Sequence, residues 1–410
     1  MAATPRPILD MNAYRGGAGD DPLLARRLAN FGAASVLFYD RPIQMVRGRG
    51  AWMEAADGTR YLDCYNNVLS VGHCHPRVVA AMAAQTAEIN VNSRYLHATV
   101  ETYLERLKAL LPPDLSNVLL CCSGSEANDL AMRVAMKATG RRGFIVTEAA
   151  YHGNTLAVTE ISPSSWRRGD RPAHARLVPA PGRSAYGDDV AGGFAAAVTA
   201  AAAALAADGF GLAGFICDSI FSSDGVHADP PGFLRPAVAA ARAAGGIYIA
   251  DEVQPGFGRT GAGMWGFARH GVRPDVVTMG KPMGNGYPVA AAAGLAVLDA
   301  IEDEGMIANA ATRGAQIRAG LDALAARDAR IAEVRGAGLF LGVEMAGPDA
   351  PALVRRLIDG LRARRVLIGA AGRYGETLKI RPPLSLSDDE AGFFLDALAA
   401  VLTAMPLTPA

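Results

Sequence analysis

The stretch Gly246-Ile247-Tyr248-Ile249-Ala250-Asp251 is a short apolar run that ends in a carboxylate. A second run, Asp275-Val276-Val277-Thr278-Met279-Gly280-Lys281, ends in a lysine. Runs of this length, rich in β-branched residues, are typical of buried strands. In a mainly parallel sheet, ligands bind at the carboxyl ends of the strands. We therefore expect Asp251 and Lys281 to face one shared ligand.

Other β-prone runs lie at 143–146 and 213–217. Helical patterns at 125–138 and 233–244 alternate with these runs. Short apolar strands that alternate with longer helical segments predict βα units. The expected fold class is therefore α/β, with a large domain built on a mainly parallel sheet.

The pattern changes after about residue 300. Residues 336–344 are predicted to form a strand after a turn, 353–365 an amphipathic helix, and 377–381 a strand that Pro382-Pro383 ends. We expect a smaller α+β domain at 301–410 and a large cofactor-binding domain at 51–300, with a hairpin-like segment at 50–62. The segment 1–50 is expected to contribute to the small domain.

Composition limits the possible partners. The 410 residues include 40 basic and 40 acidic side chains, so nothing indicates nucleic acid or an anionic membrane, and small molecules are the expected partners. Five cysteines without a CxxC pair, and no apolar leader, predict a reduced, cytoplasmic protein. The alanine-rich run 195–207 is interpreted as a helix packed on the protein surface, too short and too weakly apolar to span a bilayer.

Lysine and aspartate at these positions suit one cofactor. A lysine amine can form a Schiff base with an aldehyde, and a carboxylate can pair with a protonated ring nitrogen, which are the two groups that pyridoxal phosphate requires. The segment Cys122-Ser123-Gly124-Ser125-Glu126-Ala127-Asn128 precedes a predicted helix whose N-terminus could bind the phosphate. The alternatives are a strand-capping Lys281 and an ordinary helix cap at Ser123 or Ser125.

Two further motifs have competing interpretations. In Tyr151-His152-Gly153, the aromatic side chain could stack on a planar ring, or it could only pack in the core. His73 and His75 could suggest a metal, but no second ligand pair has fitting spacing, so a structural turn and no metal are predicted. The glycines of 256–261 match GxGxxG, yet they do not directly follow a strand, which argues against a dinucleotide site.

Four motifs together resemble the class III aminotransferases: Ser123 to Asn128, Tyr151-His152-Gly153, Asp251 to Gly261 and Met279-Gly280-Lys281-Pro282. The resemblance implies the type I pyridoxal-phosphate fold, similar to aspartate aminotransferase, and a homodimer with active sites at the subunit boundary. It implies that Lys281 carries the cofactor as a Schiff base and moves the proton, and that Asp251 pairs with the pyridinium nitrogen. It also implies that the cofactor is bound by Gly124, Ser125, Tyr151, His152 and Gln254.

A narrower likeness concerns Tyr65 to Val68, Val71 to Pro76 and Asn92 to His97, which are similar to the branch containing ethanolamine-phosphate phospho-lyases and bacterial aminotransferases. Ser222-Ser223-Asp224-Gly225 stands where many glutamate-using members carry Glu-Gly-Gly. The residues considered for substrate binding are Asn67, Arg94, Lys379 and Arg381, because cations and amides can bind a carboxylate or phosphate. The alternative for the charged ones is that they are solvated strand charges.

One departure from the family follows Lys281. Relatives continue after the Pro-Val pair with a strand, a helix and a Thr-Phe-Gly-Gly-Asn-Pro-like loop, whereas Pro288-Val289 here runs directly into an alanine-rich helix. About 35 residues are therefore missing by comparison, well beyond ordinary loop variation. Three functions stay open: an aminotransferase acting on an amine and a 2-oxo acid, a phospho-lyase or other amine lyase, and a catalytically impaired relative.

Overall fold

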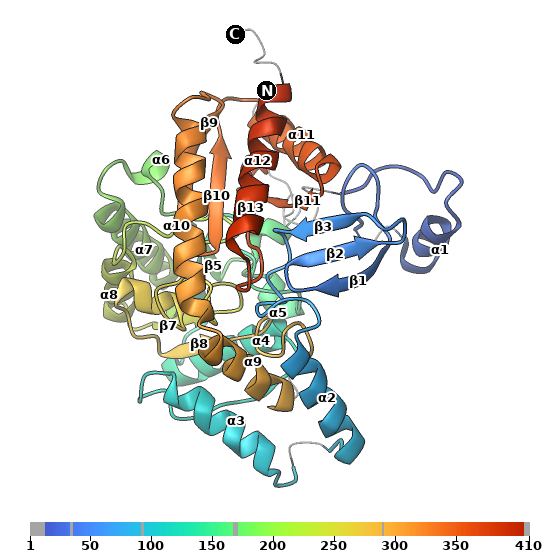
Figure 1. Ribbon diagram of the computed structural model, residues 1–410. Helices are drawn as coiled ribbons and strands as arrows, with labels where there is room; N and C mark the ends of the chain where they lie inside the picture. The colour runs from blue at the N-terminus through green and yellow to red at the C-terminus, as the bar shows by residue number, and fades with distance from the viewer. Residues whose placement is uncertain (1–12, 33–35, 92–93, 167–170, 289–290, 406–410) are drawn as a thin grey trace.

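A computed structural model describes residues 13–32, 36–91, 94–166, 171–288 and 291–405 (Figure 1). Its central sheet has five parallel strands in the order β5-β4-β6-β7-β8. The strands are β4 (Gly143–Thr147), β5 (Ala175–Val178), β6 (Leu212–Cys217), β7 (Ile247–Asp251) and β8 (Val276–Thr278). The prediction of a mainly parallel sheet is thus confirmed.

Helices cover both faces of this sheet, which explains why its strands are continuous apolar runs. On one face α7 (Val190–Ala207) and α8 (Leu234–Ala243) pack on the strands, and Phe194 of α7 contacts Phe215 of β6 with ring centroids 6.1 Å apart. On the other face α4 (Gly124–Thr139) buries Met132 in a cluster with Phe144 of β4. Successive residues of one strand therefore point into different layers.

Helix α7 has 18 residues with a mean hydropathy of 1.8, so its length and composition alone would allow it to cross a membrane. In the structure it lies against β4, β5 and α8, and it buries one stripe of side chains that includes Val198 and Leu205. The predicted helix at 195–207 is confirmed, and it begins at Val190 because the side chain of Asp189 caps its N-terminus. The expectation that this segment is too short and too weakly apolar to span a bilayer is wrong, because the helix is longer than the alanine-rich run.

A second sheet has the order β12-β13-β10-β9. It contains β9 (Ile331–Ala337), β10 (Phe340–Met345), β12 (Gly369–Ala371) and β13 (Thr377–Ile380). The prediction of one strand at 336–344 is wrong, because Gly336 and Ala337 end β9 and a tight turn leads into β10. Gly338 occupies that turn at φ +53, a backbone conformation that favours glycine.

The third sheet joins three N-terminal strands to one strand from the C-terminal part of the chain, in the order β1-β2-β3-β11. β2 (Trp52–Ala55) and β3 (Arg60–Asp63) form the predicted hairpin, and β1 (Met45–Arg49) extends it. β11 (Val366–Leu367) pairs in parallel with β3. The N-terminal hairpin is thus tied to the C-terminal part of the chain, while the domain boundaries stay a prediction.

Most of the remaining helices surround these sheets. Helices α10 and α12 pack together, and α10 lies on β9 while α11 lies on β10 and β13 (Figure 1). At the other end of the molecule α9 contacts both α2 and α3. The bounds are α1 (Pro22–Phe31), α2 (Pro76–Glu88), α3 (Ala98–Ala109), α5 (Leu156–Thr159), α6 (Arg183–Tyr186), α9 (Ala291–Asp303), α10 (Met306–Ala325), α11 (Ala350–Ala363) and α12 (Asp388–Ala404).

Candidate active site

Asp251 ends β7, and its buried carboxylate is held in place from three directions. Oδ2 accepts hydrogen bonds from Asn128 Nδ2 at 3.0 Å and from His152 Nδ1 at 2.8 Å. Oδ1 accepts a hydrogen bond from the Val253 amide at 3.1 Å. These hydrogen bonds fix the orientation of the Asp251 carboxylate, as a partner of a cationic ring nitrogen requires.

Lys281 follows β8 at the same edge of the sheet, and the charge of Asp251 acts on it. Burial lowers the pKa of the Lys281 amine, while the Asp251 carboxylate opposes that shift and the Arg381 guanidinium adds to it. A lowered pKa increases the neutral fraction of the amine, which is the nucleophilic form. The predicted proximity of Asp251 and Lys281 at one edge of the sheet agrees with this arrangement.

The N-terminus of α4 lies beside these two residues. Ser123 is the N-cap, because its Oγ accepts from the Glu126 amide at 3.2 Å, so the simple capping interpretation is correct for this residue. Gly124 backs onto Val253, and a Cβ there would lie 2.9 Å from Val253 Cγ2. A side chain at this position would therefore push the start of α4 away from Val253. The first amides of a helix lack intrahelical partners and can bind an anion.

The turn after β4 supports the start of α4. Ser125 Oγ accepts a hydrogen bond from the Asn154 amide at 3.2 Å. Gly153 adopts φ +144, and a Cβ there would come within 2.6 Å of Ser125 Oγ, so the glycine is required. Tyr151 is partly buried beside this turn, and its stacking role stays a prediction. His152 is buried, and its Nε2 has no hydrogen-bond partner among the described residues.

Gln254 connects the sheet edge to β13. Its Oε1 accepts from Asn67 Nδ2 and from Arg381 Nη1, each at 3.0 Å. Its Nε2 donates to Ser222 Oγ at 2.5 Å, and that hydroxyl donates to Asp218 Oδ2 at 2.7 Å. The stretch that replaces Glu-Gly-Gly in this chain thus provides a hydroxyl that orients Gln254.

Lys379 lies on β13 and is almost completely buried, with 1% of its surface exposed. It has no hydrogen-bond or ion-pair partner among the residues that the structure describes. Burial lowers its pKa well below the usual range, and the nearby Arg381 adds to the shift. Its neighbours across the sheet are Gly342 on β10 and Gly369 on β12, and its Nζ lies 5.7 Å from the centre of the Phe340 ring. Lys379 is therefore not a solvated strand charge.

Arg381 follows β13 directly, and its guanidinium carbon lies 4.5 Å from the centre of the Tyr65 ring. Its Nε is buried without a hydrogen-bond partner among the described residues. Arg94, by contrast, is exposed in the segment between α2 and α3, so the structure does not bring it together with the cations of β13. Asn92 and Ser93 of the same motif lie outside the described residues. The substrate-binding roles stay predictions.

Sequence reasoning missed two residues that organise the site, Asn128 and the Ser222 that orients Gln254. Asn128 donates to Asp251 and to the His152 carbonyl at 2.7 Å, and its Oδ1 accepts from Thr278 Oγ1 at 2.7 Å. Asn128 thereby joins α4, β7 and β8. The sequence offered one signal for Asn128. It lies one helical turn after Gly124, on the same face of the helix, and so close to the cofactor site.

These residues fit pyridoxal phosphate. The unpartnered Nε2 of buried His152 and the close packing of Gly124 on Val253 leave a polar cradle between α4 and the sheet edge. Asp251 would hold the ring nitrogen, the N-terminus of α4 with Ser125 the phosphate, and Lys281 the aldehyde carbon. Each part of the cofactor thus has a matching group in this chain.

The chain belongs to the class III aminotransferase family. The family profile "Aminotransferase class-III" matches residues 38–294 and 288–402, in two segments that overlap at 288–294. The enzyme is accordingly pyridoxal-phosphate dependent and has the type I fold, as the resemblance implied. The overlap coincides with the place where residues are missing by comparison with relatives; Val289 itself lies outside the described residues.

The relatives include both predicted chemistries. The chain is 36% identical to an "Alanine--glyoxylate aminotransferase 2-like" protein of Drosophila melanogaster over 431 aligned positions, which cover 92% of this chain and 86% of the relative. A solved phospholyase from Arthrobacter in complex with phosphoethanolamine is 39% identical, with a TM-score of 0.90, covering 94% of this chain and 100% of that one. A solved amine transaminase from an uncultivated Pseudomonas species, in its PLP-bound form, is 27% identical, with a TM-score of 0.80 and coverages of 89% and 95%.

Proposed function

We propose that the protein transfers an amino group from an amine or amino acid to a 2-oxo acid at Lys281. The observation that carries this proposal is the pairing of a lysine whose pKa is lowered by burial with Asp251, whose carboxylate is fixed by Asn128 and His152. Bound pyridoxal phosphate supplies an electron sink for the substrate carbon that loses a proton.

The side chains divide the work between them. Lys281 Nζ accepts the proton from the substrate carbon and returns it at the end of the half-reaction. Asp251 keeps the positive charge on the ring nitrogen, and Asn128 and His152 prevent the carboxylate from rotating. Gln254, oriented by Ser222, donates toward the phenolic oxygen of the cofactor in this proposal.

A second candidate is elimination of phosphate from a phosphorylated amino alcohol. It is favoured by Lys379 and Arg381, which flank Ile380. Neither side chain forms an ion pair with a carboxylate among the described residues. A phosphate dianion beside these two side chains would favour the protonated form of Lys379 more strongly than a monoanion does. The similar Arthrobacter structure is a phospholyase with phosphoethanolamine, which supports the same candidate.

One assay separates the two candidates. Purified enzyme loaded with pyridoxal phosphate is incubated with phosphoethanolamine, with and without a 2-oxo acid, and phosphate, ammonia and new amino acid are measured. Transfer requires the 2-oxo acid and produces the new amino acid. Elimination releases phosphate and ammonia in equal amounts without the acid. Transfer from other amines, without phosphate release, supports the first candidate alone.

The impaired-relative alternative has a separate readout. Protein that binds no pyridoxal phosphate, seen as no visible absorbance after incubation and desalting, would remove both candidates. Protein that binds the cofactor but turns over none of a panel of amines and phosphorylated amines would support impairment. Mass spectrometry of the intact protein, with sequencing of the gene, tests whether the shortened connection after Pro288 is genuine.

We further propose a cytoplasmic homodimer that binds neither nucleic acid nor membrane. All five cysteines are unpaired, which supports a reducing compartment. The equal numbers of basic and acidic residues support neither nucleic acid nor an anionic membrane as a partner. Exposed apolar side chains such as Leu96, at 97%, and Leu156, at 87%, support a second subunit. Light scattering coupled to gel filtration checks the dimer, and cell fractionation checks the compartment.

A further inference from the structure

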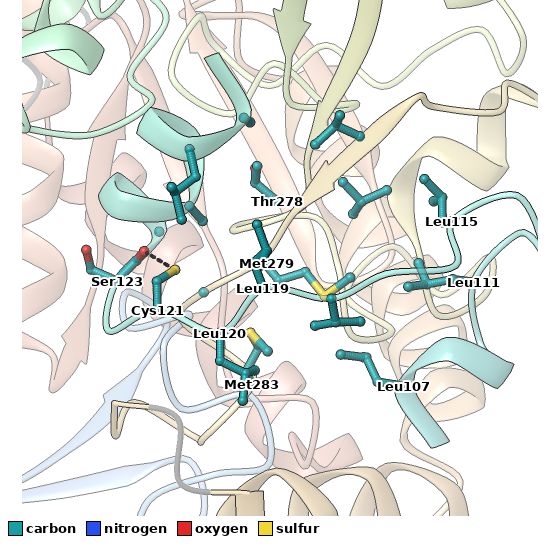
Figure 2. A pocket seen from close by; sticks show the side chains of 18 of the residues that line it. Leu107, Leu111, Leu115, Leu119, Leu120, Cys121, Ser123, Thr278, Met279 and Met283 are labelled. Atoms are coloured by element: carbon teal, nitrogen blue, oxygen red, sulfur yellow. Dashed lines mark hydrogen bonds between the residues drawn. The ribbon is translucent and has the colours of Figure 1, made fainter. Parts of the chain in front are cut away.

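A cavity of about 580 Å³ lies beside Lys281, and its lining offers little to an anionic group. Among the described residues that line it, Lys281 is the only lysine or arginine, whereas Asp114 and Asp275 are acidic. Apolar side chains such as Leu119 and Met279 form much of the remaining lining (Figure 2). Burial of an anion against apolar groups and carboxylates is unfavourable. We therefore expect the anionic group of an amine that reacts at Lys281 to lie on another side of this lysine.

Arg381 provides a cation on the side of Gln254. Burial lowers the pKa of the Lys281 amine, and the charge of Arg381 adds to the shift, so the two groups lie close enough to interact. Arg381 Nη1 donates to Gln254 Oε1 at 3.0 Å, and the guanidinium lies over the Tyr65 ring. Its Nε and Nη2 have no hydrogen-bond partner among the described residues. A planar edge with two free donors matches the oxygens of a carboxylate or a phosphate.

The direction of the Gln254 amide decides whether Arg381 can be held in this way. Gln254 Oε1 accepts from Arg381 and from Asn67 Nδ2, each at 3.0 Å, while Nε2 donates to Ser222 Oγ at 2.5 Å. A rotation of the amide by half a turn would place Nε2 against two donors. The nitrogen and the oxygen of an amide have nearly the same shape, so packing alone does not distinguish the two directions. A neighbour with fixed polarity must set the direction.

Asp218, which directly follows β6, supplies that polarity. Its carboxylate accepts hydrogen bonds from the amides of Ile220 and Ser222, each at 3.0 Å, and these bonds fix its position. Oδ2 also accepts from Ser222 Oγ at 2.7 Å. An ionised carboxylate cannot donate, so the hydroxyl hydrogen of Ser222 points to Asp218 and its lone pairs face Gln254 Nε2. Only one direction of the Gln254 amide satisfies this arrangement.

We propose that Asp218 is a positioning residue which, through Ser222 and Gln254, holds Arg381 with its Nε–Nη2 edge free for an anionic group of the substrate. The hydrogen bonds connect the end of β6 to the residue directly after β13. The substrate class is an amine that carries a second, anionic group. The inference rests on the proposed function in one respect, namely that the amine of the substrate reacts at Lys281.

Ser222→Ala tests the connection without removing a charge. In enzyme loaded with pyridoxal phosphate, we expect KM for a phosphorylated or carboxylated amine to rise roughly 3- to 10-fold, the usual effect of one hydrogen bond. KM for an uncharged alkyl amine should change by less than about twofold. Ser222→Thr keeps the hydroxyl and should restore KM for the anionic amine. Equal changes for both kinds of amine, or no change, would overturn the proposal.

Ser223→Ala is the matched control. Ser223 is the next residue in the same turn and is buried like Ser222, but its Oγ has no hydrogen-bond partner among the described residues. The variant therefore removes a buried hydroxyl that does not contact Gln254, and KM for both kinds of amine should stay unchanged. A rise in KM for the anionic amine as large as that in Ser222→Ala would show a general effect of the turn and overturn the proposal.

Binding of small anions tests the inference without turnover. Ethyl phosphate and propionate carry the anionic group but no amine, and calorimetry measures their Kd with protein treated with pyridoxal phosphate. Ser222→Ala should weaken binding of at least one of them in the unaltered background and have no further effect together with Arg381→Met. Additive losses, or binding of neither anion, would overturn the inference. If no amine reacts but the expected losses in anion binding are found, the proposed function fails and the inference is supported.

Discussion

The amide of Asn128 donates a 3.0 Å hydrogen bond to the carboxylate of Asp251, although 123 residues separate them in the chain. The same side chain accepts from Thr278 Oγ1 and donates to the carbonyl of His152. Asn128 thus fixes the position of a charge on one strand relative to its neighbour. Its loss should affect the orientation of Asp251 more than the fold.

Asn128→Ala should therefore weaken the cofactor and slow turnover. Removing a hydrogen bond to a buried charge costs about 1.5–3 kcal/mol, so we expect roughly a 10- to 100-fold loss in affinity for pyridoxal phosphate. Equilibrium dialysis with absorbance detection measures it. Thr278→Val is the comparison, because it removes a neutral hydrogen bond to Asn128 and should have a smaller effect. An affinity for Asn128→Ala equal to that of the unaltered protein would contradict the role.

Asp251→Asn should keep part of the cofactor but slow proton removal. The neutral amide cannot hold the positive charge on the ring nitrogen, so the electron sink is weaker. We expect kcat to fall by about 10²-fold or more with a smaller change in KM, and a larger primary isotope effect with substrate deuterated at the carbon that loses its proton. An unchanged kcat would disprove the assignment.

Lys281→Ala should abolish turnover, with a loss on the order of 10⁴-fold or more, since both the covalent link and the proton carrier are removed. Borohydride treatment followed by mass spectrometry should add the cofactor's mass to the unaltered protein only. Lys379→Met is the control lysine variant, and it should keep that added mass. Full activity in Lys281→Ala would refute the proposed function.

Lys379→Met should affect anionic substrates selectively. If Lys379 binds the anionic group, KM for a phosphorylated or carboxylated amine should rise by roughly 10- to 100-fold, whereas KM for an uncharged alkyl amine should stay unchanged. Steady-state kinetics on such a matched pair of amines measures the difference. Equal changes for both amines would indicate a packing defect instead.

The same variant has a stability signature. Because burial depresses the pKa of Lys379 in the folded state, the unfolded chain binds more protons, and this lysine costs stability at neutral pH. That cost shrinks as the pH rises toward the ordinary lysine pKa of about 10.4. Lys379→Met should therefore raise the free energy of unfolding more at pH 7 than at pH 10, as denaturant titrations can measure. A gain that does not depend on pH would show that the pKa of Lys379 is not lowered in the folded protein.

Asp224 offers a test on the acidic side. Burial raises its pKa to about 7, although Thr147 Oγ1 and the Ala149 amide donate to it. The folded protein therefore holds a proton that the unfolded chain releases near pH 4, so this group's contribution to stability is lost as the pH rises from about 4 to about 7. Asp224→Asn cannot titrate and can keep both hydrogen bonds by presenting NH₂ to Thr147 and its oxygen to Ala149.

Relative to the unaltered protein, Asp224→Asn should consequently gain stability between pH 4 and pH 8, on the order of 2–4 kcal/mol. Urea titrations at several pH values measure the difference between the two proteins, which removes the effect of groups that titrate in both. Parallel curves over this range would show that Asp224 is ionised throughout.

The apolar runs predicted four of the five parallel strands, because a strand buried on both faces needs no alternation and stands out in sequence. The edge strand β5 was missed, since Arg176 interrupts its apolar run. The positions of Asp251 and Lys281 followed from the rule for strand ends. Asn128 and Ser222 could not be predicted in the same way. Their partners lie on other elements, and a single hydrogen bond between distant residues leaves no periodic trace in the sequence.

The strand at 336–344 was mispredicted for a local reason. Apolar residues lie on both sides of Gly338, and the pattern alone does not show which glycine turns the chain. The error concerns pairing between strands, which propensity does not encode.

Lys379 and Lys281 are positioned by different sheets. Lys379 lies on β13 of one four-stranded sheet, whereas Lys281 follows β8 of the five-stranded sheet. The span between the two amines is therefore set by how the two sheets are joined. If Lys379 binds the anionic group of the substrate, a substrate of another chain length would require the sheets themselves to shift.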